Sequence, residues 1–518
     1  MKAVLAPLML AAVALAITTS ATAADNPSPR ELLRAAFGGA VLDTVGRFDY
    51  RLTVENSEGQ VLRDARHALA PASARLHVED LFAAGRPQVW SSPEGTWRLA
   101  DGQLQFLGDA LAKPYREHVA YHFLPMLASP QTTYTTVAPG RVRISPAGVG
   151  AFEVLLESKS GRILENRFDG GVTGRELDYR QVDGVLWPMQ FDIVSDGRTL
   201  RHGRFSDVKV TGEPALPPLE VAAVERSLPA AQRGLAALIG AGWMSTTKNE
   251  YNLSMDTARS TIVFARSEAD FEKAHIWIAR REGERWSEPA EVPFSDPRYS
   301  DSDPWLAPDG TMLYFISNRP VTGDAPRKHL DIWRVRYGAD GFGTPEHLDA
   351  LSSDAQELGP EVHDGWIYFN SSRKGGPAPL SIYRARLSGT SFDAPEPLPA
   401  PFNEGAAQGD FTLSPDGRLA MFWSVREESE DADLFVARRD DAGWSKPLRL
   451  AAPFNAVGFD FTPSFTPDGR ELLFASMRKP DWLEAGGHVL NGQSNLYVAP
   501  VVEIEAAFLD AMKRDTSN

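Results

Sequence analysis

One stretch of the chain, Ser302 to Arg319, returns several times along the C-terminal half. It reads SDPWLAPDGTMLYFISNR, and each copy has an apolar run that ends in phenylalanine. These residues are Phe264, Phe315, Phe369, Phe422 and Phe474, which lie 51 to 54 residues apart. A fixed period of this length is typical of solenoids and propellers, in which one small unit is stacked many times. The repeat therefore constrains the fold more than any local pattern does.

Each repeat has the same internal order, which predicts short β-strands joined by turns. A Pro-Asp-Gly turn, as at residues 308–310, is followed by an apolar run such as residues 312–315. Proline presets φ in such a turn, and glycine accepts a positive φ. A four-stranded unit of this kind must stack on its neighbours, and radial closure protects the strand edges. We therefore expect a mainly β chain with a C-terminal β-propeller, five blades being favoured and six possible.

The turn, the apolar run and a Ser-x-Arg that follows them resemble the TolB-type propeller repeat, which is WD-like. The Ser-x-Arg pairs are Ser317 and Arg319, Ser424 and Arg426, and Ser476 and Arg478. The resemblance covers about half of the chain, residues 248–500. Two copies depart from the pattern, since the first has Met255-Asp256-Thr257 and the third has His363 in place of proline. The resemblance implies a platform that binds a protein or a ligand, with no catalytic residues on the propeller.

The segments around the repeats predict how the ring closes. Residues 502–513 read as a helix, so the last repeat lacks its outer strand, and we expect a strand near residues 218–224 to replace it. Residues 214–219 form a proline-rich linker, and residues 230–238 read as a short helix. The expected division is a signal peptide (1–24), an α+β domain (25–217), a linker with a short helix (218–247), the propeller (248–500) and a C-terminal helix and tail (501–518).

The first 24 residues predict export. Lys2 precedes an apolar core, and Ala21-Thr22-Ala23 fits the small-residue cleavage rule, so we expect a periplasmic protein whose mature chain has no membrane span. The net charge of −16 disfavours nucleic acid as a partner. The absence of cysteine excludes disulfides and cysteine-based zinc sites.

Residues 25–217 alternate like long antiparallel strands after an early helix. The order of the helix, residues 46–56, Gly95-Thr96-Trp97-Arg98 and residues 179–188 resembles the unclosed-barrel fold of the lipoprotein carriers LolA and LolB. That resemblance implies a curved antiparallel sheet with an apolar groove for a lipid or lipoprotein. The candidate groove residues are Leu81, Phe82, Phe106, Phe123 and Met126. The alternative interpretation of these residues is ordinary core.

Acidic residues recur at the start of the repeats. They are Glu250, Asp301, Asp303, Glu357, Asp410 and Asp460. Because the first strand of a blade lines the central channel, these acids could form a ring that binds a basic peptide or partner protein. The alternative is local, because such an acid can accept backbone N–H bonds and hold its turn. The repeated arginines predict ion pairs rather than ligand contacts.

No other motif predicts chemistry. His118 and His122 lie four residues apart, as metal ligands on a helix can, but Val119 stands where a zinc protease needs glutamate. We therefore expect no metal and no cofactor. A binding or scaffold protein of the cell envelope is the favoured function, with a protein or peptide partner on the propeller. The alternative is a propeller glycosidase or lyase that uses channel carboxylates.

Overall fold

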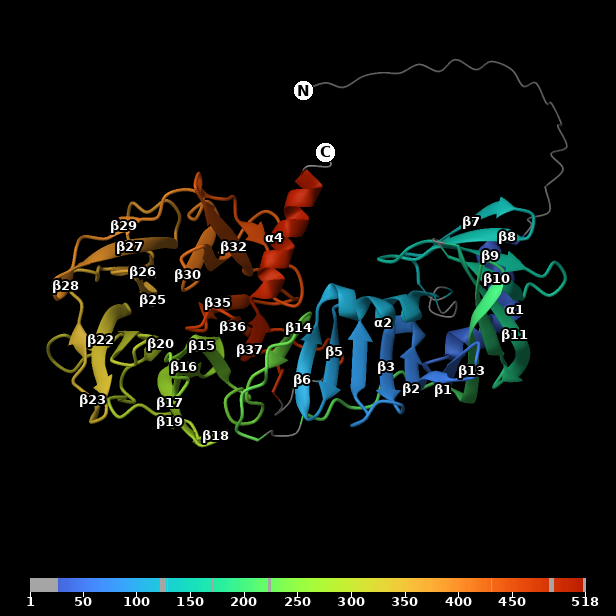
Figure 1. Ribbon diagram of the computed structural model, residues 1–518, viewed down its shortest axis with the longest axis horizontal. Helices are drawn as coiled ribbons and strands as arrows, with labels where there is room; N and C mark the ends of the chain where they lie inside the picture. The colour runs from blue at the N-terminus through green and yellow to red at the C-terminus, as the bar shows by residue number, and fades with distance from the viewer. Residues whose placement is uncertain are drawn as a thin grey trace, which may run out of the picture.

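The computed structural model describes residues 27–515 except 122–126, 128, 169–170, 222–224, 430 and 484–488. Within these residues the chain is mainly β, with two regions side by side (Figure 1). The signal peptide expected at residues 1–24 lies outside the described residues. In the part of the chain that the structure describes, no helix is both long and apolar enough to cross a membrane.

The N-terminal region is one antiparallel sheet. Along the sheet the strands lie in the order β7-β8-β9-β10-β11-β12-β13-β1-β2-β3-β4-β5-β6. Their bounds are β1 (Arg47–Asn56), β2 (Val61–Ala70), β3 (Arg75–Asp80), β4 (Gln88–Ser92), β5 (Gly95–Ala100), β6 (Gln103–Leu107), β7 (Thr133–Ala138), β8 (Arg141–Ser145), β9 (Phe152–Leu156), β10 (Ile163–Arg167), β11 (Val172–Val182), β12 (Val185–Ser195) and β13 (Arg198–Thr211). Strands β9 and β10 form an antiparallel pair, in keeping with the alternation expected across residues 25–217.

Two helices pack on this sheet. Helix α1 (Pro29–Phe37) begins with a capping box, in which Ser28 and Glu31 satisfy each other's backbone N–H groups, and it contacts β12 and β7. Its apolar side buries Leu33 and Phe37 in a core that also contains Phe48 and Trp187. Helix α2 (Asp109–Tyr121) lies over β3 to β6. The early helix is therefore confirmed, although it ends at Phe37 and a 3₁₀ turn (Gly39–Thr44) follows.

The C-terminal region is a propeller-like arrangement of small antiparallel sheets, as the repeat predicts. Four sheets are separate, and each has three longer strands and two strands of two residues. They consist of β15 (Asn249–Met255), β16 (Thr261–Ser267), β17 (His275–Glu282), β18 (Arg285–Trp286) and β19 (Ala290–Glu291); β20 (Asp301–Leu306), β21 (Met312–Ser317), β22 (Asp331–Gly338), β23 (Gly341–Phe342) and β24 (Glu346–His347); β25 (Glu357–His363), β26 (Trp366–Ser371), β27 (Ser381–Ser388), β28 (Ser391–Phe392) and β29 (Glu396–Pro397); and β30 (Ala407–Leu413), β31 (Leu419–Val425), β32 (Asp433–Asp440), β33 (Gly443–Trp444) and β34 (Leu448–Arg449). Each of these four repeats thus has one strand more than the four expected.

The register of the strands is the same in every repeat. The five phenylalanines of the sequence period each lie opposite an aromatic residue of the next strand. The pairs are Phe264 with Trp277, Phe315 with Trp333, Phe369 with Tyr383, Phe422 with Phe435, and Phe474 with Tyr497. Glycine also adopts a positive φ in the three Pro-Asp-Gly turns, at Gly310, Gly417 and Gly469. The periodicity therefore reports a true structural repeat.

The fifth repeat does not form a separate sheet, so the expected count of five or six blades is wrong in this respect. Its strands β35 (Asp460–Phe465), β36 (Glu471–Ser476) and β37 (Asn495–Pro500) continue into β14 (Leu235–Leu238). Strand β14 also pairs with β6 of the N-terminal region. One sheet of seventeen strands therefore runs through both regions, and the separate sheets number four (Figure 1).

Two expectations about the linker are wrong for the same reason. The short helix expected at residues 230–238 is absent, because residues 235–238 form β14 between two strand edges. That pairing also makes β14, and not residues 218–224, the strand that covers β37; of the latter segment residues 222–224 lie outside the described part. The C-terminal helix is confirmed as α4 (Val502–Asp515), with Ile504 buried against the fifth repeat.

Candidate functional site

The first strands of the five repeats meet around a central hub. β15 contacts β20, β20 contacts β25, β25 contacts β30, β30 contacts β35, and β35 contacts β15. Every one of these strands has a register shift at the same place, with a residue of positive φ. The five residues are Asn252, Asp303, Gly359, Asp410 and Thr462. A bulge of this kind re-aims one side chain, which here brings the hub residues together.

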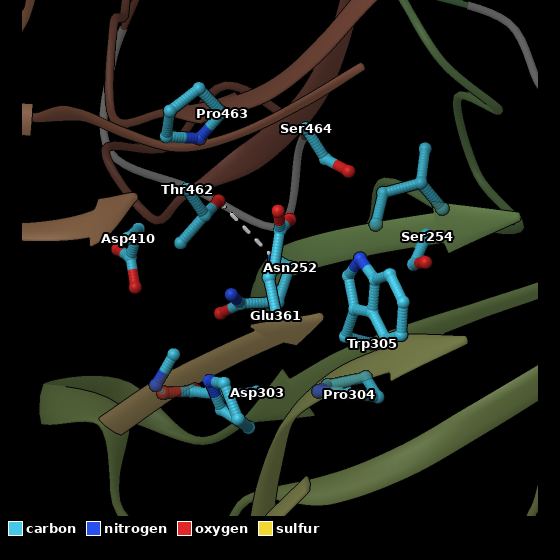
Figure 2. Close-up of a pocket in the computed structure, with 13 residues that line it drawn as sticks. Asn252, Ser254, Asp303, Pro304, Trp305, Glu361, Asp410, Thr462, Pro463 and Ser464 are labelled. Atoms are coloured by element: carbon cyan, nitrogen blue, oxygen red, sulfur yellow. Dashed lines mark hydrogen bonds between the residues drawn. The ribbon is translucent and has the colours of Figure 1, made fainter. Parts of the chain in front are cut away.

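Two carboxylates converge at the hub, from the second and fourth repeats (Figure 2). Asp303 accepts the N–H of Gly359 at 2.9 Å, and Asp410 accepts the Trp423 indole N–H at 2.7 Å. Burial raises the pKa of Asp303. It also raises the pKa of Asp410 to about 7, and the nearby charge of Asp303 adds to this shift. The two groups therefore titrate as a pair.

The hub has very little free space. Its cavity volume is about 10 Å³, which is about the room needed for one water molecule. A sugar ring does not fit there. Glu361, the third acid of the hub, is occupied by a contact with His363 at 2.9 Å. Asn252 donates its backbone N–H to Thr462 across the same space.

The remaining acids of the predicted ring lie elsewhere, each fully buried in its own repeat beside an arginine. The pairs are Glu250 with Arg266 at 2.9 Å, Asp301 with Arg319 at 2.6 Å, Glu357 with Arg373 at 3.1 Å, and Asp460 with Arg478 at 2.7 Å. The arginines also donate to carbonyl oxygens of the loop that enters the repeat, as Arg478 does to Pro453. These ion pairs hold the strands to that loop. The structure thus brings together only Asp303 and Asp410 of the six acids.

A second site, which the sequence did not indicate, lies in the N-terminal sheet. A cavity of about 240 Å³ opens between α2 and strands β10 to β13. Most of its wall is apolar, with a few polar groups. The lining residues are Leu52, His118, Tyr121, Asn166, Phe168, Gly174, Glu176, Pro188, Phe191, Ile193 and Phe205. An apolar cavity with a few converging polar groups is the usual form of a small-molecule site.

The polar groups of this cavity are centred on Glu176. Gly174 lies directly opposite Asn166 in the β10–β11 pair, and Glu176 is two residues further on the same face of β11. Asn166 Nδ2 donates to Glu176 Oε1 at 2.8 Å, and the Tyr179 hydroxyl donates to Oε2. Burial raises the pKa of Glu176 to about 7. The carboxyl group is therefore held inside the cavity wall. Burial, Tyr179 and Asn166 set its pKa, and no cationic group is among these influences.

Glycine makes room for the aromatic wall. Gly203 of β13 lies directly opposite Phe191 of β12, and a Cβ at Gly203 would overlap the Phe191 ring. The Phe191 ring packs at 5.6 Å from Phe205. His118 enters the cavity from α2 and contacts the Tyr50 hydroxyl at 2.6 Å. His118, considered from the sequence only as a possible metal ligand, therefore lies in the wall of this cavity.

The predicted groove residues that the structure describes, Leu81, Phe82 and Phe106, do not line this cavity. Phe106 is buried in the core that the N-terminal sheet shares with the fifth repeat, where Arg478 lies over its ring. Phe82 is exposed on a turn, and Leu81 is half-buried beside it. Phe123 and Met126 lie outside the described residues. The sequence does not indicate Glu176 and Asn166 as site residues, because a polar residue in an alternating strand normally faces solvent.

Metal binding has no support in the part of the chain that the structure describes. No group of three or more histidine, cysteine, aspartate or glutamate residues there has the arrangement of a metal site. A hollow of about 440 Å³ lies beside α4, between residues such as Asp416, Arg438 and Glu505.

No protein-family model and no curated protein sequence matches the chain. Solved structures do resemble it. A protein assigned as TolB from Agrobacterium tumefaciens is 14% identical, with 49% of this chain and 90% of that chain covered and a TM-score of 0.31. An alpha-L-arabinofuranosidase from Lactobacillus brevis is 13% identical, with 50% and 92% covered and a TM-score of 0.36. A DUF1329 family protein from Desulfovibrio piger is 10% identical, with 35% and 91% covered and a TM-score of 0.27. Likenesses at this level identify neither an activity nor a ligand.

Proposed function

We propose that this chain is an exported binding protein, periplasmic after removal of its signal peptide. Its N-terminal sheet holds an apolar or amphipathic ligand in the cavity beside α2, and its propeller serves as the scaffold that recognises a protein or peptide partner. The cavity volume of about 240 Å³, with its largely apolar wall, carries this proposal. A cavity of about 150 Å³ is enough for benzene, so this one accommodates a ring with a short chain, or part of a longer lipid.

The rigid connection between the two regions supports a shared function. β14 pairs with β6 on one side and with β37 on the other, so the two regions share backbone hydrogen bonds. They also share a core in which Trp90 and Trp97 pack with Phe474 and Tyr497. A partner bound to the propeller would therefore hold the cavity in a fixed orientation. The acids at the hub offer such a partner little room, so its contacts would lie on the rim.

A fluorescence titration tests the binding function. N-phenyl-1-naphthylamine, an apolar dye that brightens out of water, should bind the full chain in a saturable way. Gly174→Leu should weaken this binding at least tenfold, because its side chain would fill the cavity beside Asn166 and Phe168. Arg175→Leu is the matched control, since it adds the same side chain to the exposed face of β11. Equal binding by wild type and Gly174→Leu would remove the cavity from the proposal.

The alternative function, a glycosidase or lyase on the propeller, draws on the Asp303 and Asp410 pair. Such enzymes need two carboxyl groups with different pKa values. The cavity of about 10 Å³ beside them opposes this reading. Release of reducing sugar from a panel of oligosaccharides, abolished by Asp410→Asn, would favour it over the binding function.

A further inference from the structure

The cavity in the N-terminal sheet contains an unmatched hydrogen-bond acceptor. Asn166 is only 8% exposed, and its Oδ1 has no hydrogen-bond partner among the described residues. Its amide is oriented by the bond from Nδ2 to Glu176, so Oδ1 is the atom that remains. A buried amide oxygen without a partner costs free energy, and a polar group left in this state calls for a physical explanation such as strain, a bound water or a functional role.

Glu176 adds a second acceptor on the same face of the sheet. An ionised carboxylate has about four acceptor positions. Here Glu176 accepts one hydrogen bond from Asn166, and it shares the single Tyr179 hydroxyl proton with the Ile163 carbonyl oxygen. The side chain is half-buried and lines the cavity, so its remaining acceptor positions can be reached from there. A ligand with hydrogen-bond donors at this end would fill the remaining acceptor positions.

The charges around the cavity favour a positive donor. Burial dominates the pKa of Glu176, and no arginine or lysine contributes to it. The Arg162 guanidinium packs over the Tyr179 ring, 5.7 Å from the ring centre. The His118 side chain contacts the Tyr50 hydroxyl. A cation brought by the ligand would compensate the buried carboxylate, whereas an anion would be repelled by it. The aromatic wall also attracts a cation through its ring faces.

We infer that the cavity recognises a primary ammonium ion carried on a small apolar body. The ammonium group donates to the Glu176 carboxylate, which Asn166 orients through Nδ2, and the apolar body packs against Phe168, Phe191 and Phe205. This inference rests on the proposed function and specifies its ligand class. It distinguishes the cavity from one that takes the acyl chain of a fatty acid, whose carboxylate would meet Glu176.

Isothermal titration calorimetry on the full chain tests this with three ligands of one size: 2-phenylethylammonium, 2-phenylethanol and phenylacetate. The ammonium ion should bind roughly 10- to 100-fold tighter than the alcohol, the factor expected for a charged hydrogen bond. Phenylacetate should bind more weakly than the alcohol. Glu176→Gln, which keeps the shape of the side chain, should bring the ammonium ion and the alcohol to within about threefold.

Glu165→Gln is the matched control, because Glu165 lies next to Asn166 on the opposite face of β10 and pairs with Arg141 and Arg167. It should keep the preference for the ammonium ion. Equal affinity of wild type for the ammonium ion and the alcohol would overturn the inference and leave the proposed function standing. So would a preference that persists in Glu176→Gln. If neither these ligands nor the apolar dye binds wild type, the proposed function fails as well. Should Glu176→Gln not fold, the ranking of the three ligands by wild type decides alone.

Discussion

The N-terminal cavity and the propeller hub each contain a carboxyl group whose pKa is raised to about 7, Glu176 and Asp410. The space beside them differs, with about 240 Å³ in the cavity and about 10 Å³ in the hub. Their origins differ too. Asp410 lies at a bulge that all five repeats share, whereas Glu176 lies on a strand that belongs to no repeat. A perturbed pKa therefore indicates a ligand site only where the geometry also leaves room for a ligand.

The largest expected effect is a difference in stability: removing an acid that is paired with arginine should cost more than removing a hub acid. Asp460→Asn leaves the Arg478 guanidinium, which is 1% exposed, without its carboxylate and should lower the free energy of unfolding by roughly 3–5 kcal/mol. Asp303→Asn removes a charge that Asp410 repels, so it should lower the free energy of unfolding by less than about 1 kcal/mol. Urea unfolding of the two variants measures the difference. Equal losses would mean that the hub acids are as structural as the paired ones.

The second effect tests the difference in free space. Gly359 has a φ of +56°, and a Cβ there would overlap Asp410 Oδ1, so Gly359→Ala should destabilise the protein by roughly 1–3 kcal/mol. At Gly174 a Cβ would meet Asn166 and Phe168 at 3.6 to 3.8 Å, which is ordinary contact. Gly174→Ala should therefore change stability by no more than about 0.5 kcal/mol. Thermal unfolding compares them, and a destabilised Gly174→Ala would contradict an open cavity.

The smallest effect is a pH dependence at the hub. The pKa of Asp410 is raised in the folded state, so its contribution to stability is full below pH 3.8 and is lost as the pH rises through 7. Asp410→Asn removes this dependence. Its melting temperature should therefore improve relative to wild type between pH 5 and pH 8, by a few degrees. Asp303 and Glu361 act on the same group and stay in both proteins, as does His363, which contacts Glu361. A parallel pH profile for the two proteins would show that Asp410 is already ionised when folded.

The sequence predicts the propeller well because the repeat is encoded in local turns and apolar runs. Spacing to the phenylalanine separates the acids only in part, because Glu357 also lies 12 residues before Phe369 and yet pairs with Arg373. Asp303 and Asp410 lie 12 residues before Phe315 and Phe422, whereas Asp301 and Asp460 lie 14 residues before Phe315 and Phe474. The structure places the first pair at the hub and the second pair beside arginines. Position within the repeat, and not acidity, decides which of these side chains face the centre.

The sequence could not predict the merged sheet or the cavity. Residues 235–238 read as helical by composition, but two unpaired strand edges, β6 and β37, bind them as β14. Pairing of this kind is a tertiary effect that overrides local preference. The role of Glu176 likewise depends on strand pairing, which places it directly beside Phe191 of β12, and on α2, whose His118 and Tyr121 line the same cavity. The resemblance to LolA and LolB stays a prediction.

Photoaffinity labelling with a small alkylamine that carries a diazirine tests most directly which of the two regions holds a ligand. After irradiation of the full chain, proteolysis and mass spectrometry locate the adducts. We predict adducts within residues 163–211, which include Phe168, Glu176 and Phe191, and their loss when 2-phenylethylammonium is present in excess. Adducts confined to residues 249–500 would place the ligand on the propeller and contradict the account.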